Sequence, residues 1–440
     1  MTLDKRRVNQ VSNRILVVAL LYLYLYNPIP KWPGVGFVAL LMLVALAYGA
    51  LHYKTVLGYL KYYRAELLLS LFMIVYVPAI CLVNGHAWMP VAKDLVLWLW
   101  CVTLVPIFLL EAVLSKYKSI RILDLLLDVG VVAAFITLLA VLVPPFNTFL
   151  RGIQSFQEYA GVSDMVETQS GYRFFGLASN LVSGYGFVQG ILASLCLLKI
   201  ARKRLIRIRE NRFVKVNREG WFYVFAFFAL LLSVVVNART GLFPVILTAL
   251  FLLLRSLRKR DVRTFVKIGI GVAAVAVAFV VLLKVFPEIA AFALDFFLQI
   301  SGFLGDSGIG SSAYGTMLKF PETLTGIVFG EGRSIFLEEM GYRSDIAYVN
   351  QLFMGGLVFV AALLVYEFIV YRKICKRSGT FLFPTVCFLS LLIFNYKGTA
   401  FYATNAVVKF WMLYYFALVY NKRHRERPIP LSNDPALTTV

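Results

Sequence analysis

The sequence predicts an all-α polytopic integral membrane protein, and three observations lead to this fold class. Of the 440 residues, 60% are hydrophobic and only 15% are charged, a composition far from that of soluble proteins. Apolar stretches long enough to cross a hydrocarbon core of about 30 Å recur along the whole chain. Lys and Arg residues gather in every second connection between these stretches. Together these features indicate a bundle of membrane-spanning helices.

About twelve stretches have the length and composition of a transmembrane helix, which needs roughly 20 mostly apolar residues. Little sequence remains between them for a soluble domain, so residues 1–440 are predicted to form a single transmembrane domain. The expected spans are 14–30, 34–51, 66–84, 92–113, 122–145, 177–200, 221–237, 241–255, 268–286, 346–370, 380–395 and 404–420.

The positions of the basic residues predict the orientation of these helices. The N-terminus, alternate connections and the C-terminal tail hold 33 of the 44 Lys and Arg residues. The positive-inside rule assigns these segments to the cytoplasm, together with both termini. The same rule accounts for the net charge of +21 without a nucleic-acid partner. In a bacterium, this corresponds to a multi-pass protein of the inner (cytoplasmic) membrane.

In this orientation two of the outward connections are long, and they cover 146–176 and 287–345. Long ordered connections are frequently functional. The second begins with a predicted amphipathic interfacial helix and continues into the Gly- and Ser-rich stretch 301–315, which could be a linker or a mobile lid. We therefore expect any chemistry on this outer, periplasmic side.

Metal and cofactor motifs are missing from the sequence. The five Cys and three His residues have no metal-ligand spacing, and no Asp-x-Asp pair, phosphate-binding Gly-rich loop or nucleophile elbow is present. The sequence thus predicts no metal and no cofactor. Asp124 and Asp128, near the cytoplasmic start of a span, are expected to stabilise that helix end beside Lys118 and Arg121.

Eleven cations lie outside the cytoplasmic segments, so orientation does not explain them. Arg239 occupies a short outer turn, "NARTGL", between two spans, and Arg173 precedes a span containing Gly184, Gly186 and Gly190, where small residues permit close helix packing. Converging arginines suit a phosphate or pyrophosphate group, whose oxygens match the guanidinium fork. The eleven are Lys31, Lys93, Arg151, Arg173, Arg239, Lys284, Lys319, Arg333, Arg343, Lys397 and Lys409.

A third polar segment, residues 330–360, runs directly into a span. Asp345 at its outer end is either a helix-capping residue or a base that takes a proton from an attacking hydroxyl. Tyr348 lies on the same helical face three residues later, and Asn350 follows. Three glutamates, Glu331, Glu338 and Glu339, are alternative carboxylates for the same role.

The chain resembles the bacterial O-antigen polymerases of the Wzy type and the related O-antigen ligases. The resemblance is carried by "NARTGL" at 237–242, "VFGEG" at 328–332 and "RSDIAYVNQLFMGGLVF" at 343–359, together with the hydropathy layout. Ligases commonly place a histidine where the chain re-enters the membrane after the large loop. Here Asp345 stands in that neighbourhood and the loop has no histidine, which favours the polymerase.

The resemblance implies a GT-C-like membrane glycosyltransferase that acts at the periplasmic face. A growing glycan would leave undecaprenyl pyrophosphate and join a sugar hydroxyl of a new lipid-linked repeat unit. The partner proteins that the resemblance suggests are a chain-length regulator and a flippase. Arg173 and Arg239 would stabilise the departing pyrophosphate, with Asp345 as the base. The remaining expected contacts to the pyrophosphate or glycan are Arg333, Arg343, Tyr348, Asn350 and Lys397.

Three alternatives remain open from the sequence: an O-antigen ligase, a flippase or other transporter of lipid-linked oligosaccharides, and a glycosyltransferase that uses a polyprenyl phosphate sugar. A flippase should line a passage through the full membrane thickness with polar side chains. The polyprenyl phosphate enzymes often carry acidic residues in the first outer loop, and "NPIPKWP" at 27–33 has none.

Overall fold

The computed structural model describes residues 5–115, 120–154, 176–178, 183–202, 206–209, 212–216, 218–237, 239–259, 269, 319–333, 346–397 and 405–426. These residues are almost entirely helical. The N-terminal half contains α1 (Lys5–Tyr26), α2 (Phe37–Leu51), α3 (Tyr53–Leu60), η1 (Lys61–Tyr63), α4 (Arg64–Val83), α5 (Trp88–Phe108), η2 (Leu109–Val113), α6 (Ile122–Leu142) and α7 (Pro144–Ile153).

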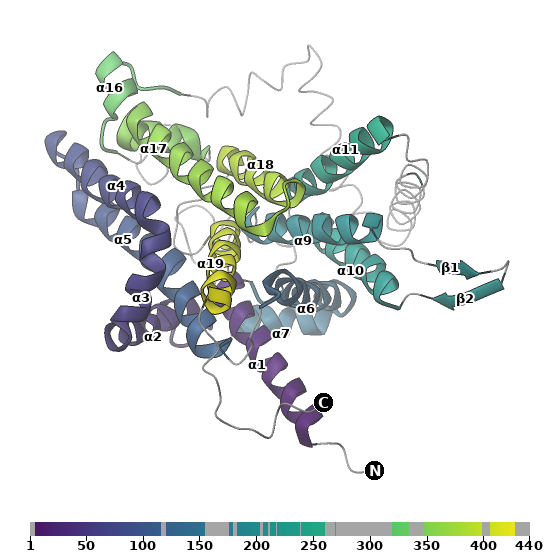
Figure 1. Ribbon diagram of the computed structural model, residues 1–440. Coiled ribbons are helices and arrows are strands. Elements are labelled where there is room, and N and C mark those ends of the chain that lie inside the picture. The colour runs from purple at the N-terminus through teal and green to yellow at the C-terminus, as the bar shows by residue number, and fades with distance from the viewer. Residues whose placement is uncertain are drawn as a thin grey trace.

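The second half adds one hairpin to a further set of helices. Strands β1 and β2 pair antiparallel between α9 and α10 and project from the bundle (Figure 1). The elements are α9 (Ser183–Arg202), β1 (Ile206–Arg209), β2 (Arg212–Val216), α10 (Arg218–Val235), η3 (Arg239–Gly241), α11 (Leu242–Lys259), α16 (Leu324–Phe329), α17 (Ala347–Ser378), α18 (Leu382–Lys397) and α19 (Ala406–Glu426).

The predicted class, an all-α membrane protein, is confirmed. Within the described residues, six helical stretches are long and apolar enough to cross a membrane, and three shorter apolar helices accompany them. Helices α11 and α19 coincide with predicted spans but belong to neither group. The predicted span 268–286 lies outside the described residues, apart from Gly269, and the predicted loop 146–176 begins inside α7.

Helix α19 forms the centre of the bundle (Figure 1). Its residues 406–417 are all buried, including Lys409, and it packs against helices from both halves of the chain, among them α1, α5, α9 and α17. A helix enclosed by other helices does not face lipid, so it tolerates the tyrosines and the lysine that lower its hydropathy. The neighbouring helices present their apolar side chains to the outside instead.

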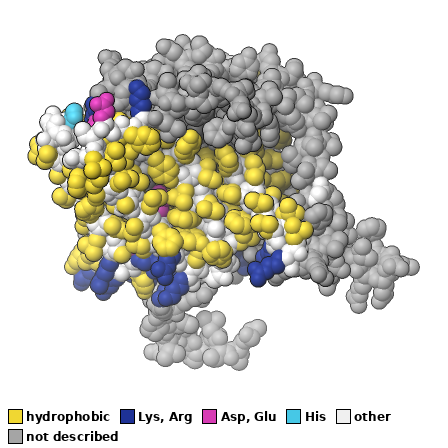
Figure 2. Space-filling view, turned by 90° about the horizontal axis from the view of Figure 1, so that it is seen from above, with side chains coloured by type: hydrophobic (Ala, Val, Ile, Leu, Met, Phe, Trp, Pro, Cys, Tyr) yellow, Lys and Arg dark blue, Asp and Glu magenta, His cyan; other side chains and the backbone are white. Residues whose placement is uncertain are grey.

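Apolar side chains cover the face of the molecule shown in Figure 2, and Lys and Arg side chains gather along one edge of this apolar surface. We call this edge the cation-rich end. It includes the start of α4 with Arg64, the end of α17 with Lys376 and Arg377, and the end of α19 with Lys422 and Arg423. The segments that contain η3, α16 and the start of α17 lie toward the opposite end.

Ion pairs at the cation-rich end join different helices. Asp128 on α6 accepts from Arg14 on α1 at 2.5 Å, and Asp124 pairs with Lys199 on α9. Both aspartates therefore stabilise contacts between helices, whereas the sequence led us to expect a local role at their own helix end. The reason is that α1 and α9 both pack against α6 and bring their cations to it.

Candidate functional site

Helix α17 is folded back on itself at Gly356. The backbone at Gly356 has φ 66° and ψ −168°, a conformation that is essentially restricted to glycine. A Cβ atom here would also lie 2.3 Å from the carbonyl oxygen of Val328. Gly356 therefore separates a short first segment, residues 347–355, from the long second segment that continues to Ser378.

The contacts with α18 show how far the first segment folds back. Tyr371 hydrogen-bonds Thr385 at 3.0 Å and the rings of Phe368 and Phe388 lie 6.3 Å apart, so the second segment runs antiparallel to α18. If α17 were a straight helix through Gly356, Gln351 would lie about 15 Å beyond Asn395 along the axis of α18.

Instead, Gln351 Nε2 donates to Asn395 Oδ1 at 3.3 Å, and the Tyr348 hydroxyl donates to the Leu392 carbonyl at 3.0 Å. The first segment thus lies back alongside α18, and it carries buried polar side chains into the bundle. Non-helical backbone of this kind occurs at membrane depth where it is enclosed by protein or lines a cavity.

The η3 turn, which contains the backbone of Arg239, is seated directly on α9. A Cβ atom at Gly190 would lie 1.8 Å from the carbonyl oxygen of Gly241, and one at Gly241 would lie 2.1 Å from that of Gly186. Backbone therefore contacts backbone, which only glycine permits at these positions. The close approach expected from the small residues of this span is confirmed, and it fixes where the "NARTGL" turn lies.

The turn on α9 and the folded-back segment belong to one region. Phe187, between the two glycines of α9, packs against Phe394 on α18 with ring centroids 4.9 Å apart. The next residue of α18 is Asn395, the partner of Gln351. On the other side, a Cβ atom added at Gly184 would lie 3.8 Å from the Ala406 amide nitrogen and 4.0 Å from Asn405 Oδ1, at the start of α19.

Residues 319–333 pack on the turn of the folded-back helix. A Cβ atom at Gly330 would lie 2.5 Å from Gly355 Cα, and the Glu331 amide donates to the Phe353 carbonyl at 2.8 Å. The guanidinium of Arg333 pairs with Glu331 at 2.6 Å and lies 5.4 Å from the ring centre of Phe353. The "VFGEG" motif therefore supports the segment that contains Tyr348.

The predicted site residues are described to different extents. Arg333, Tyr348 and Asn350 are fully described, and the last two belong to the folded-back segment. For Arg239 and Lys397, the structure describes the backbone in η3 and at the end of α18 and not the side chain. Arg173, Arg343 and Asp345 lie outside the described residues.

Two ionisable side chains are buried among the helices. The sequence indicated Lys409 only weakly and did not indicate Glu367. Lys409 on α19 is fully buried, and its Nζ makes no hydrogen bond to the described residues and lies 5.6 Å from the Tyr24 ring centre. Glu367 on α17 is 1% exposed, and neither carboxylate oxygen has a hydrogen-bond partner within the described part of the chain. Glu367 could have been noticed as the one carboxylate between 346 and 370.

Chemically, this end of the bundle combines a fixed backbone with polar side chains. Amide and hydroxyl groups of Tyr348, Asn350 and Gln351 can hydrogen-bond a polar ligand, and the turn of Arg239 is held against α9. No group of three or more His, Cys, Asp or Glu residues that could hold a metal ion occurs among the described residues.

Fold and site together define a helical integral membrane protein with a folded-back helix and a polar region at the end opposite the cations. No protein-family model and no curated protein matches the chain.

Proposed function

We propose that the protein polymerises lipid-linked oligosaccharide repeat units at the periplasmic face of the bacterial inner membrane. The growing glycan is transferred from its undecaprenyl pyrophosphate to a sugar hydroxyl of a new lipid-linked repeat, without a metal ion. The polymer belongs to the cell-envelope polysaccharides, such as O-antigen.

One observation supports this proposal above the others: the three motifs that resemble O-antigen polymerases meet around the folded-back segment. "VFGEG" packs on its turn, "RSDIAYVNQLFMGGLVF" includes the segment itself, and the "NARTGL" turn reaches it through α9 and α18. The "NARTGL" turn is separated from "VFGEG" by 85 residues of sequence, so chain proximity does not require this turn to lie near the other two motifs.

In the proposed reaction, negative charge accumulates on the pyrophosphate as the anomeric bond breaks. Arg173 and Arg239 stabilise this charge more in the transition state than in the ground state, and Arg343 and Lys397 bind the same anion. Arg333 is a weaker candidate for binding the pyrophosphate than these four residues, because its guanidinium already pairs with Glu331. Asp345 takes the proton of the acceptor hydroxyl, and Tyr348 and Asn350 bind the glycan.

Arg239→Ala is expected to reduce polymer formation at least about a hundredfold, the usual cost of losing one donor to a developing anion. Purified protein in detergent is supplied with lipid-linked repeats in buffer containing a chelator, and product length is measured on gels. Arg151→Ala, on α7 at the same end of the molecule, is the matched control and should retain activity. Long polymer made by folded Arg239→Ala at the wild-type rate would refute the proposal.

A transporter of lipid-linked oligosaccharides is the second candidate, and the buried Lys409 and Glu367 are the observation in its favour. Ionisable groups at membrane depth often mark pathways for ions or substrates. The proposed polymerase has no chemical task for either group. A variant of one of them therefore distinguishes the two functions.

If the polymerase assignment is right, Lys409→Met should raise the thermal midpoint Tm and leave polymer formation within about twofold. The amine is buried and has no hydrogen bond to the described part of the chain, so replacing it by an apolar chain of similar length should stabilise the fold by about 1–3 kcal/mol. Lys54→Met, at an exposed position, should change neither quantity. Loss of oligosaccharide translocation in a stabilised Lys409→Met protein would favour the transporter.

A further inference from the structure

A cavity of about 1020 Å³ opens at the cation-rich end, far along the helices from the region assigned to the polymerase. Its walls come from the starts of α6 and α18 and the ends of α9, α17 and α19. Six of the described lining residues are cationic, and Asp124 is the one acidic residue among them. The cations are Arg121, Lys199, Lys373, Lys376, Arg377 and Lys422.

Carboxylates neutralise only part of this charge. Lys199 pairs with Asp124, and Lys373 pairs at 2.6 Å with Glu66, which is fully buried behind the cavity wall. For Arg121, Lys376 and Arg377, the described residues provide no ion pair. The positive-inside rule explains why cations lie at this end, but it does not require four helix ends to bring six of them to the lining of one cavity.

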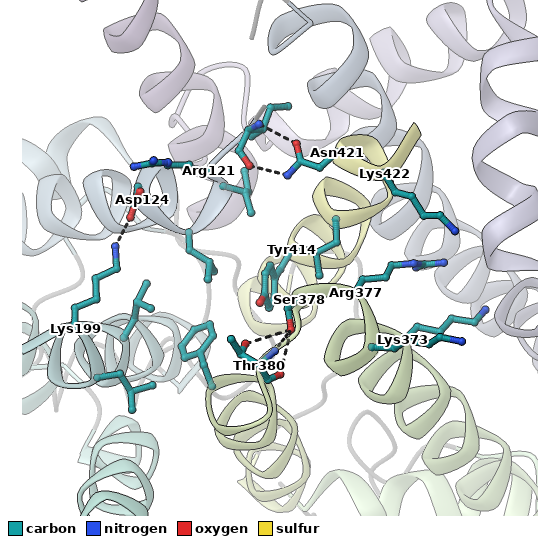
Figure 3. A pocket seen from close by; sticks show the side chains of 18 residues that line it. Arg121, Asp124, Lys199, Lys373, Arg377, Ser378, Thr380, Tyr414, Asn421 and Lys422 are labelled. Carbon is teal, nitrogen blue, oxygen red and sulfur yellow. Dashed lines mark hydrogen bonds and ion pairs between the residues drawn. The ribbon is translucent and has the colours of Figure 1, made fainter. Parts of the chain in front are cut away.

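Three of the cations gather around a single tyrosine. Arg377 and Lys422 each lie 5.5 Å from the ring centre of Tyr62, and Lys373 Nζ donates to the Tyr62 carbonyl at 2.9 Å. Figure 3 shows these three side chains extending in the same direction from α17 and α19, away from Arg121 and Lys199. Glu66 balances the charge of Lys373, and an anion bound beside Arg377 and Lys422 would reduce the repulsion between these two.

Arg377 is the most constrained member of this group. Its guanidinium also lies 5.0 Å from the ring centre of Tyr415, and its Nη1 atom is buried with no hydrogen-bond partner among the described residues. A buried guanidinium donor without an acceptor is costly, and phosphate oxygens are the acceptors that its geometry matches best.

The wall between the two groups of cations is fixed by hydrogen bonds of its own. Asn421 exchanges two hydrogen bonds of 2.9 Å with the backbone of Ile120, and Ser378 bonds Thr380 across the turn between α17 and α18. The first pair of bonds ties α19 to the start of α6, and the second bond fixes the turn between α17 and α18.

We propose that this cavity binds a phosphate-bearing anion, with Arg377, Lys422 and Lys373 as its principal contacts. The phosphate can belong to an anionic phospholipid headgroup, which reaches the cavity from the membrane edge, or to a soluble phosphate compound. This binding site is separate from the proposed polymerase region and does not depend on that function.

The experiment measures binding to the full-length protein purified in detergent. Phosphatidylglycerol, phosphatidylcholine and inorganic pyrophosphate are each titrated, and the complex is followed by native mass spectrometry and by the shift in Tm. The tested variants are Arg377→Gln and Lys422→Gln. Arg258→Gln is the matched control, because Arg258 is an exposed cation near the end of α11 and does not line the cavity.

Each tested variant should lower affinity for the preferred ligand about tenfold, as expected for the loss of one charge-assisted contact. Arg258→Gln should bind as the wild type does. Preference for phosphatidylglycerol identifies a lipid headgroup, and preference for pyrophosphate identifies a soluble phosphate. Wild-type affinity in the folded Arg377→Gln and Lys422→Gln proteins, or no preference of the wild type for phosphatidylglycerol or pyrophosphate over phosphatidylcholine, would overturn the proposal.

Discussion

Gly190→Ala is expected to prevent the normal packing of the η3 turn and to abolish activity. The added Cβ atom would lie 1.8 Å from the carbonyl oxygen of Gly241. Both groups belong to, or are attached directly to, the backbone, so no side-chain rotation relieves the overlap. Either α9 or the connection between α10 and α11 must move, and we expect a loss of about 3 kcal/mol or more in stability.

Gly184→Ala is the control because it makes the same chemical change on the same helix. Its Cβ atom would meet its nearest neighbour, the Ala406 amide nitrogen, at 3.8 Å, an ordinary van der Waals contact. Alanine also favours helix over glycine by about 1 kcal/mol, so this variant should keep or raise Tm. Thermal unfolding in detergent compares the two proteins. Equal Tm values would contradict the described contact between α9 and η3.

The sequence predicted the helical class well because hydropathy reports directly on the membrane. Apolar runs such as those of α4, α5 and α6 appear in the structure with nearly the predicted boundaries. The glycines of α9 likewise predicted a close approach, because small residues on a span let a neighbouring segment come near. The sequence could not identify their partner, because nothing in the sequence distinguishes Gly241 from any other glycine in a turn. Only the structure shows that this turn packs on α9.

Pairings between helices were beyond the reach of the sequence. Asp124 and Asp128 have the spacing of residues that stabilise their own helix, yet their partners come from α9 and α1. The cavity around Arg377 poses the same difficulty, because its basic residues come from four separate segments. In the sequence these cations look like the residues that set membrane orientation. Only the arrangement of the helices shows that they line the same cavity.

The fold-back of α17 was also hidden in the sequence. The apolar pattern continues through Gly355 and Gly356 without a break, so residues 346–370 were predicted as one span. The reversal depends on the backbone conformation at Gly356 and on residues 328–330 packed against it, a tertiary contact that hydropathy does not encode. This matters for the site, because the reversal is what carries Tyr348 and Gln351 to α18.

Gly356→Ala is therefore expected to displace the folded-back segment and to abolish polymer formation. Two costs add: the backbone conformation is closed to alanine, and the Cβ atom would lie 2.3 Å from the Val328 carbonyl oxygen. The second cost falls on the contact with the "VFGEG" motif. Tyr348 and Gln351 should then lose their hydrogen bonds to α18, which exposes the segment to proteolysis.

Gly379→Ala separates these two costs. Gly379 also has a positive φ, 62°, but no atom lies within 4 Å of the position of an added Cβ. It should lose only about 1–2 kcal/mol for the left-handed backbone and keep its activity. Polymer length, Tm and limited proteolysis are compared for both variants. If Gly356→Ala is no more impaired than Gly379→Ala, the contact between the turn and Val328 is unimportant, and the folded-back segment cannot be what positions the site.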